Sequence, residues 1–233
     1  MPTEKTIGVI AAMASEIAAL KAKITNPVSE TISGVEFVSG RLGETSIVAA
    51  QSGVGKVFAA LCTQTMILRF QPAMIVNIGV GGSLTPKLNI ADVCVASAAV
   101  EHDMDTTAFG DPPGFLWGIG QVELPCDQRI VSAFERAAKR LGVHTETGVI
   151  ASGDTFVSDA ETKARLHKTF SALACEMEGG AVAHVCYVNR LPFGILRAVS
   201  DNGDENAEQS YTDALDSAAA VALAVAEEAL KEL

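Results

Sequence analysis

Acidic residues follow three apolar runs of this sequence, each where a buried strand is expected to end. The first run leads into Glu16, a later one into Glu176 and Glu178, and the last into Asp201. A carboxyl group beside a buried strand is costly unless it is paired, solvated or used in chemistry. Taken singly, each acid is better explained as a helix N-cap or first-turn acid. Together, at equivalent strand ends, they predict one crevice equipped for general acid and base catalysis.

Two glycine-rich segments, 52–56 and 79–83, follow the second and third expected strands and flank this crevice. The first lacks the spacing of a P-loop and the Ser or Thr that follows its Lys. The second lacks the third Gly of the dinucleotide fingerprint. Both segments therefore indicate only tight turns where the backbone approaches another group closely.

Other chemistries find little support in the sequence. The run 102–105 (His-Asp-Met-Asp) has metal-ligand residue types, but no second cluster with ligand spacing accompanies it, so neither a metal nor a cofactor is expected. His144, His167 and His184 stand singly and are expected to be structural. No Ser/His/Asp or Cys/His set suggests acyl transfer. The five cysteines include no C-x-x-C pair and are predicted to be buried, reduced thiols.

Short apolar runs alternate with segments of helical spacing along the whole chain. Strands are predicted at 6–13, 46–51, 74–79, 92–98, 172–177 and 193–200, and helices at 16–23, 56–70, 128–141, 160–167, 179–189 and 212–233. A capping-box spacing at Ser210-Tyr211-Thr212-Asp213 is expected to open the last helix.

The alternation predicts an α/β fold. No linker or repeat divides the chain, so we expect a single domain over residues 1–233, with a mixed, largely parallel, twisted sheet flanked by helices on both faces. In such sheets ligands bind beyond the carboxyl ends of the strands, which is where the acids are expected.

Composition narrows the class of protein further. Apolar residues make up 48% of the chain but aromatic residues only 5%, which indicates a core of Ala, Val, Ile and Leu. A formal net charge of −11 argues against a nucleic-acid surface. The N-terminus shows no signal-peptide cleavage site, and its apolar run is too short to span a bilayer, so we expect a cytoplasmic protein without membrane attachment.

Several motifs, read in order, resemble one family. They lie at 12–16, 52–57, 77–82, 102–110, 152–156, 176–178 and 197–201; the most specific are E-M-E at 176–178, R-A-V-S-D at 197–201 and H-D-M-D-T-T-A-F-G at 102–110. Over essentially the whole chain the sequence resembles the 5′-methylthioadenosine/S-adenosylhomocysteine nucleosidases, whose fold is nucleoside phosphorylase-like. The resemblance implies hydrolysis of an N-glycosidic bond to adenine and a 5-substituted ribose, with a role in methionine salvage.

The resemblance also implies roles for the acids. Glu16 is similar to the general base that activates the attacking water. Glu178 is similar to the acid that holds the ribose hydroxyls, helped by the backbone around Met177. Asp201 resembles the residue that protonates N7 of the departing adenine, with Ser200 steadying it.

Further roles follow from the same resemblance. Phe156 matches the aromatic residue that stacks on the base, and the backbone of Val157 matches the segment that reads the adenine edge. Met13, Val54 and Tyr211 match the surroundings of the ribose and the 5′ group. The remaining residues expected to bind substrate are Val80, Gly81, Gly82, Glu176 and Arg197. Phe109 is similar to a residue that reaches into the partner subunit's pocket, which implies a homodimer.

General chemistry agrees with these roles. Cleavage of an N-glycosidic bond passes through an oxocarbenium-like state that carboxylates stabilise. Neutral adenine leaves more readily than its anion, so an acid at N7 is needed, and burial would help Asp201 to keep its proton.

The sequence departs from the family pattern at Val80, at Gly179-Gly180 and at 111–117. These departures leave the preferred 5′ group open, and 5′-deoxyadenosine and aminodeoxyfutalosine are further candidates. Two other functions stay open. One is a purine nucleoside phosphorylase on the same fold; its hexameric relatives carry arginines at the positions that look equivalent to Glu16 and Asn77, and a serine at that of Val80. The other is a nucleoside-binding protein without catalysis.

Overall fold

The computed structural model describes residues 6–233; residues 1–5, on which the interpretation of the N-terminus partly depends, lie outside it. Four parallel strands form its centre: β4 (Thr45–Gln51), β1 (Ile7–Ala11), β5 (Met74–Ser83) and β10 (Phe193–Asp201), in that order. Every residue of β1, β5 and β10 is buried, as expected for continuous apolar strands covered on both faces.

The sheet then closes on itself. Antiparallel to β10 runs β6 (Val93–Glu101), next to it lies the parallel β8 (Thr145–Ser152), and then β9 (Ala174–Glu176), which pairs with β5. Because β5 also pairs with β10, the strands β10, β6, β8, β9 and β5 form a ring. The register Gly82↔Cys175 and Gly82↔Asp201 therefore brings the ends of β9 and β10 to the same end of β5.

The antiparallel part of the sheet is larger than the sequence pattern indicated. A hairpin of β2 (Thr25–Ile32) and β3 (Val35–Leu42) extends the sheet beyond β4, and the short β7 (Leu124–Pro125) pairs with β6. The apolar pattern of the sequence predicted none of these three strands, nor β8. Most of β2 is exposed, so it carries no apolar alternation that would mark it as a strand. The mixed α/β class is confirmed, but the sheet is less parallel than predicted.

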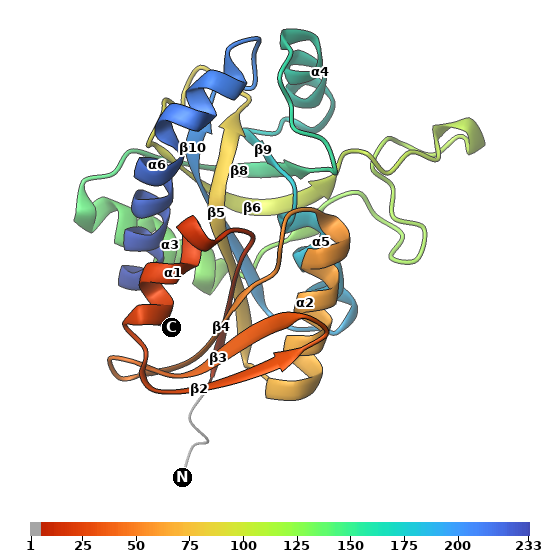
Figure 1. Ribbon diagram of the computed structural model, residues 1–233. Helices are drawn as coiled ribbons and strands as arrows, with labels where there is room; N and C mark the ends of the chain where they lie inside the picture. The colour runs from red at the N-terminus through yellow and green to blue at the C-terminus, as the bar shows by residue number, and fades with distance from the viewer. Residues whose placement is uncertain (1–5) are drawn as a thin grey trace.

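Helices cover both faces of the sheet (Figure 1). On one side α1 (Ala14–Ala22), α3 (Gln128–Leu141) and α6 (Ala207–Leu230) pack together, and on the other α2 (Lys56–Phe70) packs against α5 (Gly179–Val188). The remaining helix, α4 (Ala160–Phe170), follows β8. The bounds of α2 and α3 are those predicted.

The predicted start of the last helix was wrong. Helix α6 begins at Ala207, after Asn206, so Ser210 lies inside the helix and forms no capping box. The chain turns earlier because Asp204 accepts a hydrogen bond from the amide of Asn206 (2.9 Å), and Ala207 is fully buried. Because α6 begins at Ala207, Tyr211 lies on the second turn of this helix.

The cysteines are free and buried, as predicted. Burial raises the pKa of the Cys62, Cys94, Cys126 and Cys175 thiols to about 12, which makes them poor nucleophiles. In the described residues no helix combines the length and apolar character needed to cross a membrane.

Between β6 and α3 the chain leaves the body of the molecule as an arm, residues 103–123 (Figure 1). The short 3₁₀-helix η1 (Thr107–Phe109) lies in it, and a single bridge between Leu116 and Gln121 closes its outer loop. Phe109 and Trp117 in the arm are 83% and 64% exposed, although both are large apolar side chains.

Candidate active site

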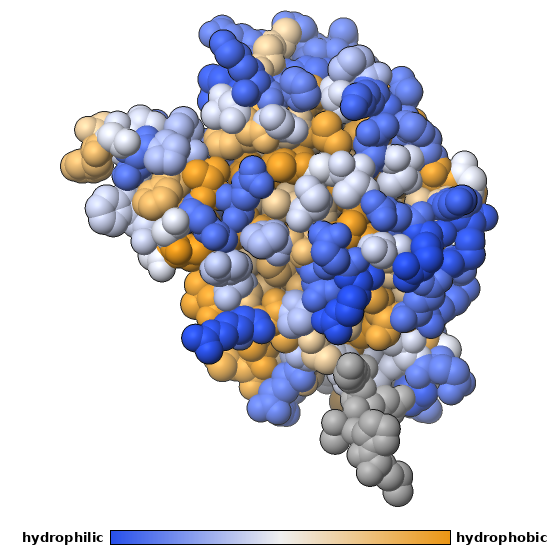
Figure 2. Space-filling model, turned by 180° about the vertical axis from the view of Figure 1, so that it is seen from behind, coloured by the Kyte–Doolittle hydropathy of each residue, from blue (hydrophilic) through white to orange (hydrophobic). Residues whose placement is uncertain are grey.

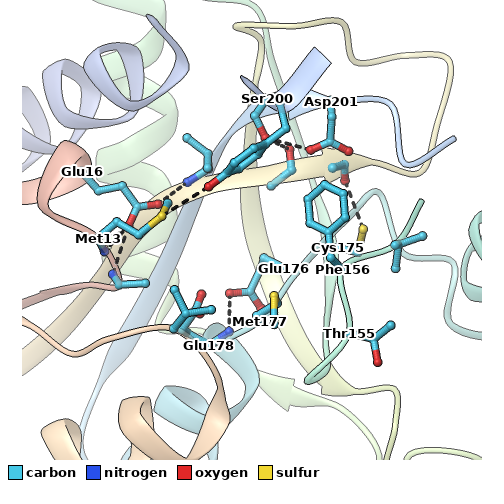
Figure 3. A pocket seen from close by; sticks show the side chains of 17 residues that line it. Met13, Glu16, Thr155, Phe156, Cys175, Glu176, Met177, Glu178, Ser200 and Asp201 are labelled. Carbon is cyan, nitrogen blue, oxygen red and sulfur yellow. Dashed lines mark hydrogen bonds between the residues drawn. The ribbon is translucent and has the colours of Figure 1, made fainter. Parts of the chain in front are cut away.

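A pocket of about 560 Å³, including its open mouth, lies beyond the carboxyl ends of β1, β5, β9 and β10 (Figure 3). Its size suits a small organic ligand. Its lining comes from distant parts of the chain: Ala12, Met13, Glu16, Val54, Val80, Gly81, Gly82, Thr155, Phe156, Val157, Cys175, Glu176, Met177, Glu178, Ser200, Asp201 and Tyr211.

Most residues predicted to form the site lie in this lining, including all four acids. Ala12, Thr155 and Cys175 line it as well and were not predicted. Two predicted residues do not line it. Phe109 is on the arm, and Arg197 lies behind the pocket wall, only 2% exposed.

Glu16 is held on one side of the pocket by three backbone amides. It lies in the first turn of α1, and its carboxylate accepts from Ala12 (3.0 Å), Met13 (2.9 Å) and Val80 (2.9 Å). Burial raises its pKa above the usual value, against the opposing effects of Arg197 and these amides. The side chain is thus a fixed and readily protonated base.

Glu176 is fully engaged by its neighbours. It accepts from Ser152 Oγ and from Arg197, and its Oε2 accepts from the amides of Glu178 (3.0 Å) and Gly179 (2.6 Å) at the start of α5. Burial alone would raise the pKa of Glu176, but Arg197 and these hydrogen bonds hold it below the usual range. Glu176 therefore stays ionised and serves as an anchor.

Arg197, predicted to bind substrate, lies outside the pocket lining. Its guanidinium donates to Glu176 and to Asn77 Oδ1 (2.6 Å) and lies 3.9 Å from Glu178, so it contacts the acids from behind the pocket wall. Asn77 and Ser152, which the sequence analysis did not assign, orient this pair from β5 and β8. Their only sequence signal is a polar residue within or at the end of an apolar strand.

Glu178 lines the pocket and has fewer hydrogen-bond partners than Glu176. One oxygen accepts from the amide of Gly55 (2.8 Å). Burial and the neighbouring Glu176 raise its pKa to about 7, although Arg197 opposes the shift. Two glutamates of one E-M-E motif thus differ in protonation because one faces the guanidinium and amides and the other faces the cavity.

Asp201 ends β10 on the side opposite Glu16 (Figure 3). Its two oxygens accept from Ser200 Oγ (2.9 Å) and from the amide of Gly203 (2.9 Å). Burial raises its pKa above the usual range. Phe156 lies on the same side of the pocket, so a planar ring seated there would meet a carboxyl group that keeps its proton unusually well.

The glycine-rich segment of β5 has a steric explanation. A Cβ at Gly79 would lie 2.5 Å from Glu16 Oε1, at Gly81 2.7 Å from the carbonyl oxygen of Cys175, and at Gly82 2.7 Å from Asp201 Oδ1. A side chain at Gly79 or Gly82 would therefore displace an acid, and a side chain at Gly81 would displace the backbone of β9. The glycines are therefore needed for the carboxyl groups to approach β5.

The mouth of the pocket is apolar and aromatic. Tyr211 donates to Met13 Sδ (3.3 Å), and its ring meets that of Phe156 edge-on at 5.6 Å between centroids. Phe156 remains 42% exposed and Val54 49%. This end can accept an apolar substituent of a ligand.

The charged residues in the pocket lining are all acids. The lining contains acids but no Lys, Arg or His, and within residues 6–233 no three His, Cys, Asp or Glu side chains are grouped to hold a metal ion. In the 102–105 run, Asp103 accepts from Lys56 Nζ (2.6 Å) and Asp105 from the amide of Thr107 (2.9 Å). The site thus offers paired acid and base groups around a pocket for a neutral or cationic species.

Comparison with known proteins identifies the class of this fold and site. The family model of the phosphorylase superfamily matches residues 6–231, so the chain is a member of that superfamily. A 5′-methylthioadenosine/S-adenosylhomocysteine nucleosidase of Shewanella halifaxensis is 37% identical over 209 residues, which are 89% of this chain and 90% of that protein. The chain belongs to the family of these nucleosidases.

Solved structures agree. The nucleosidase of this name from Neisseria meningitidis, in complex with methylthio-immucillin-A, superposes with a TM-score of 0.95 at 36% identity, over 98% of this chain and 100% of that one. The futalosine hydrolase of Helicobacter pylori gives a TM-score of 0.95 at 34% identity, over 100% of both chains. The predicted family and fold class are confirmed.

Glu178→Gln is predicted to stabilise the folded protein at neutral and alkaline pH but not at acid pH. Because the pKa of Glu178 is raised from 4.5 to about 7, the stability contributed by its proton is complete below pH 4.5 and lost as the pH rises through 7. Glutamine keeps an oxygen for the Gly55 amide without the charge. The free energy of unfolding should therefore exceed that of the wild type by up to about 3 kcal/mol above pH 7. Urea unfolding at about pH 4 and pH 8 measures this; an equal gain at both would contradict it.

Proposed function

We propose that this protein hydrolyses the N-glycosidic bond of 5′-methylthioadenosine and S-adenosylhomocysteine, releasing adenine and a 5-substituted ribose. The observation that carries the proposal is the pocket itself. Carboxyl groups from separate strand ends face one cavity from opposite sides, with raised pKa values at Glu16, Glu178 and Asp201 and no cation in the lining. The nucleosidases to which the chain is similar bear the names of these two substrates.

In this proposal Asp201 is the general acid. It donates its proton to N7 of adenine, so that the base leaves as a neutral molecule, and Ser200 fixes the orientation of its carboxyl group. The ring of Phe156 stacks on the base, and the backbone of Val157 reads its edge. All four residues line the pocket, and Ser200, Asp201 and Phe156 lie on one side of it.

Glu16 and Glu178 act at the sugar. The oxocarbenium-like transition state develops positive charge on the ribose, which the surrounding carboxylates stabilise. Glu178 accepts hydrogen bonds from the ribose hydroxyls, while Glu16 takes a proton from the water that attacks C1′. Glu176 does not touch substrate in this scheme, because its oxygens are occupied by Ser152, Arg197 and the α5 amides.

The 5′ substituent lies among Met13, Val54 and Tyr211 at the apolar mouth. A thioether carbon chain suits this surface. We include 5′-deoxyadenosine and aminodeoxyfutalosine among the candidate substrates. For the second, the support is the likeness to the futalosine hydrolase of Helicobacter pylori.

Water, rather than phosphate, is the proposed nucleophile. A phosphate dianion at C1′ would need arginines and hydroxyl donors converging there. Instead it would meet Glu16 and Glu178, while the nearby Arg197 lies outside the lining and donates to Glu176 and Asn77. The apolar Val80 offers it no side-chain hydrogen bond.

The experiment that tests the function is product analysis with and without phosphate. Purified protein is expected to release adenine and free 5-methylthioribose from 5′-methylthioadenosine at a rate unaffected by added phosphate, because the pocket repels the dianion. A panel of 5′-substituted adenosines then ranks the substrates. Formation of a ribose 1-phosphate, or a rate that requires phosphate, would identify a phosphorylase. Binding without release of any base would identify a nucleoside-binding protein.

Asp201→Asn is predicted to reduce turnover by about 10²–10⁴-fold or more, because an amide cannot deliver a proton to N7. The asparagine still accepts from Gly203, so binding of methylthio-immucillin-A and the far-UV circular dichroism should change little. The rate of adenine release measures the effect, with Asp216→Asn, an exposed residue of α6 outside the lining, as the control. Turnover near that of the wild type would remove Asp201 from the mechanism.

We also propose a cytoplasmic homodimer in which Phe109 of each copy completes the pocket of the other. The free thiols are typical of a reducing compartment. Val57, Phe58, Leu61 and Leu68 on α2 are 78%, 55%, 41% and 70% exposed, and Figure 2 shows apolar residues gathered on one face beside the arm. An apolar area of this kind usually marks a protein interface.

Phe109→Ala is predicted to leave the dimer intact and to weaken substrate binding by roughly 30-fold, the loss expected from about 2 kcal/mol of apolar burial. Phe58→Asp on α2 is predicted to shift the protein to monomers of low activity. Sedimentation velocity and the KM for 5′-methylthioadenosine measure both. A fully active monomer at assay concentration would refute the shared pocket.

A further inference from the structure

A network of charged side chains lies outside the pocket lining, around Lys56. Its ammonium group donates to Asp103 Oδ1 (2.6 Å) and to Glu101 Oε2 (3.0 Å), and the other oxygen of Glu101 lies 2.7 Å from His184 Nδ1. Asp103 also accepts from the amide of Asp154 (2.9 Å). These residues come from α2, from α5, from the end of β6 with the segment that follows it, and from the segment after β8.

Lys56 occupies an unusual place for a cation. It is the first residue of α2, where the helix dipole favours negative charge, and the first turn of this helix contains no acid. The N-cap residue is Gly55, which has no side chain to accept the free amides of the first turn. Asp154 from another loop supplies the acceptor, since its Oδ1 binds the Lys56 amide at 2.7 Å.

The two residues joined by this hydrogen bond, Lys56 and Asp154, adjoin different parts of the pocket. On one side, Gly55 precedes Lys56, and its amide holds Glu178 (2.8 Å). On the other, Asp154 directly precedes Thr155, Phe156 and Val157, which line the pocket where the base is placed. A Cβ at Gly55 would lie 3.0 Å from Asp154 Oδ1, and the φ of +98° there suits glycine, so the two loops meet at close range.

We propose that Lys56, Asp103 and Asp154 are positioning residues that lock the loop holding Glu178 to the loop carrying Phe156 and Val157. The proposal depends on the proposed function for its catalytic consequence. It assigns to these residues no contact with substrate. Their effect is to fix the distance between the group that holds the ribose and the surface that receives the base, so that both engage one nucleoside at once.

The charged side chains around Lys56 are largely shielded from water, which suits a fixed connection better than a solvent-exposed ion pair does. The side chains of Lys56 and Glu101 are 18% and 11% exposed, so water screens them little. Burial alone would lower the pKa of Lys56, but its hydrogen bonds to Asp103 and Glu101 raise it. Burial would likewise raise the pKa of Asp103, yet Lys56 and the Asp154 amide lower it. Lys56 and Asp103 therefore both stay charged near neutral pH.

The test compares two substitutions at one position. Asp154→Asn keeps an oxygen that accepts from the Lys56 amide, whereas Asp154→Ala removes it. A second pair, Lys56→Arg and Lys56→Met, keeps or removes the charge. Lys21→Met is the matched control: Lys21 is 16% exposed, pairs with Glu36 at 3.1 Å, and lies at the far end of α1 from the pocket.

We expect the conservative variants to keep most of the wild-type kcat/KM and the disruptive variants to lose it. Asp154→Ala and Lys56→Met should lower kcat/KM for adenine release at least about tenfold, since small misplacements of positioning groups can cost about 10²-fold. Asp154→Asn and Lys56→Arg should retain most of it. Lys21→Met should match the wild type in the rate of adenine release, although its loss of thermal stability should be similar to that of Lys56→Met.

Amide hydrogen exchange gives a readout that does not require activity. In Asp154→Ala, exchange should accelerate in both segments 53–57 and 153–158, with the core strands unchanged. If the wild type releases no adenine, the proposed function fails, and the exchange result still tests the lock. Equal rates for Asp154→Ala and Asp154→Asn, faster exchange in one segment only, or losses that follow thermal stability as in Lys21→Met would each overturn the proposal.

Discussion

Four carboxyl groups share one small pocket, and a single buried guanidinium makes this arrangement possible. Ionised carboxylates at such short range repel one another strongly in a low-dielectric site. Arg197 is placed behind the wall, where it neutralises Glu176 fully and reaches Glu178 only at 3.9 Å. Burial raises the pKa of each of the other three acids, whereas Arg197 and the hydrogen bonds to Glu176 overcome the effect of burial there. Glu176 stays ionised, while the pKa values of Glu178, Glu16 and Asp201 are raised.

The closed ring of strands follows from the same constraint. Since β9 joins both β8 and β5, and β5 also pairs with β10, the acids after β9 and β10 are fixed on one rigid frame. The close approach of Glu16 and Asp201 to β5 excludes side chains at Gly79 and Gly82, and the backbone of β9 excludes one at Gly81. Because the strands are paired in this way, Glu176 and Asp201 are held close to the other acids of the pocket.

Charge also separates hydrolysis from phosphorolysis within one superfamily. The fold provides a crevice at strand ends that serves either reaction, and the nucleophile is selected by what surrounds C1′. Here the surroundings are acidic, and the nearby guanidinium donates to Glu176 and Asn77 behind the pocket wall, which favours a neutral nucleophile and a cationic transition state.

The sequence by itself determined the class of fold, the family and most of the pocket. Long apolar strands and acids at their ends are local patterns, and the motifs around Glu16, Glu178 and Asp201 are contiguous. It did not reveal β2 or β8, because an exposed edge strand and a mixed-polarity strand lack a clear period. Nor did it place Arg197, Asn77 and Ser152 behind the wall, or join Asp154 to Lys56. Those assignments depend on strand pairing and on contacts between residues up to 120 positions apart, which only the folded chain brings within hydrogen-bond distance.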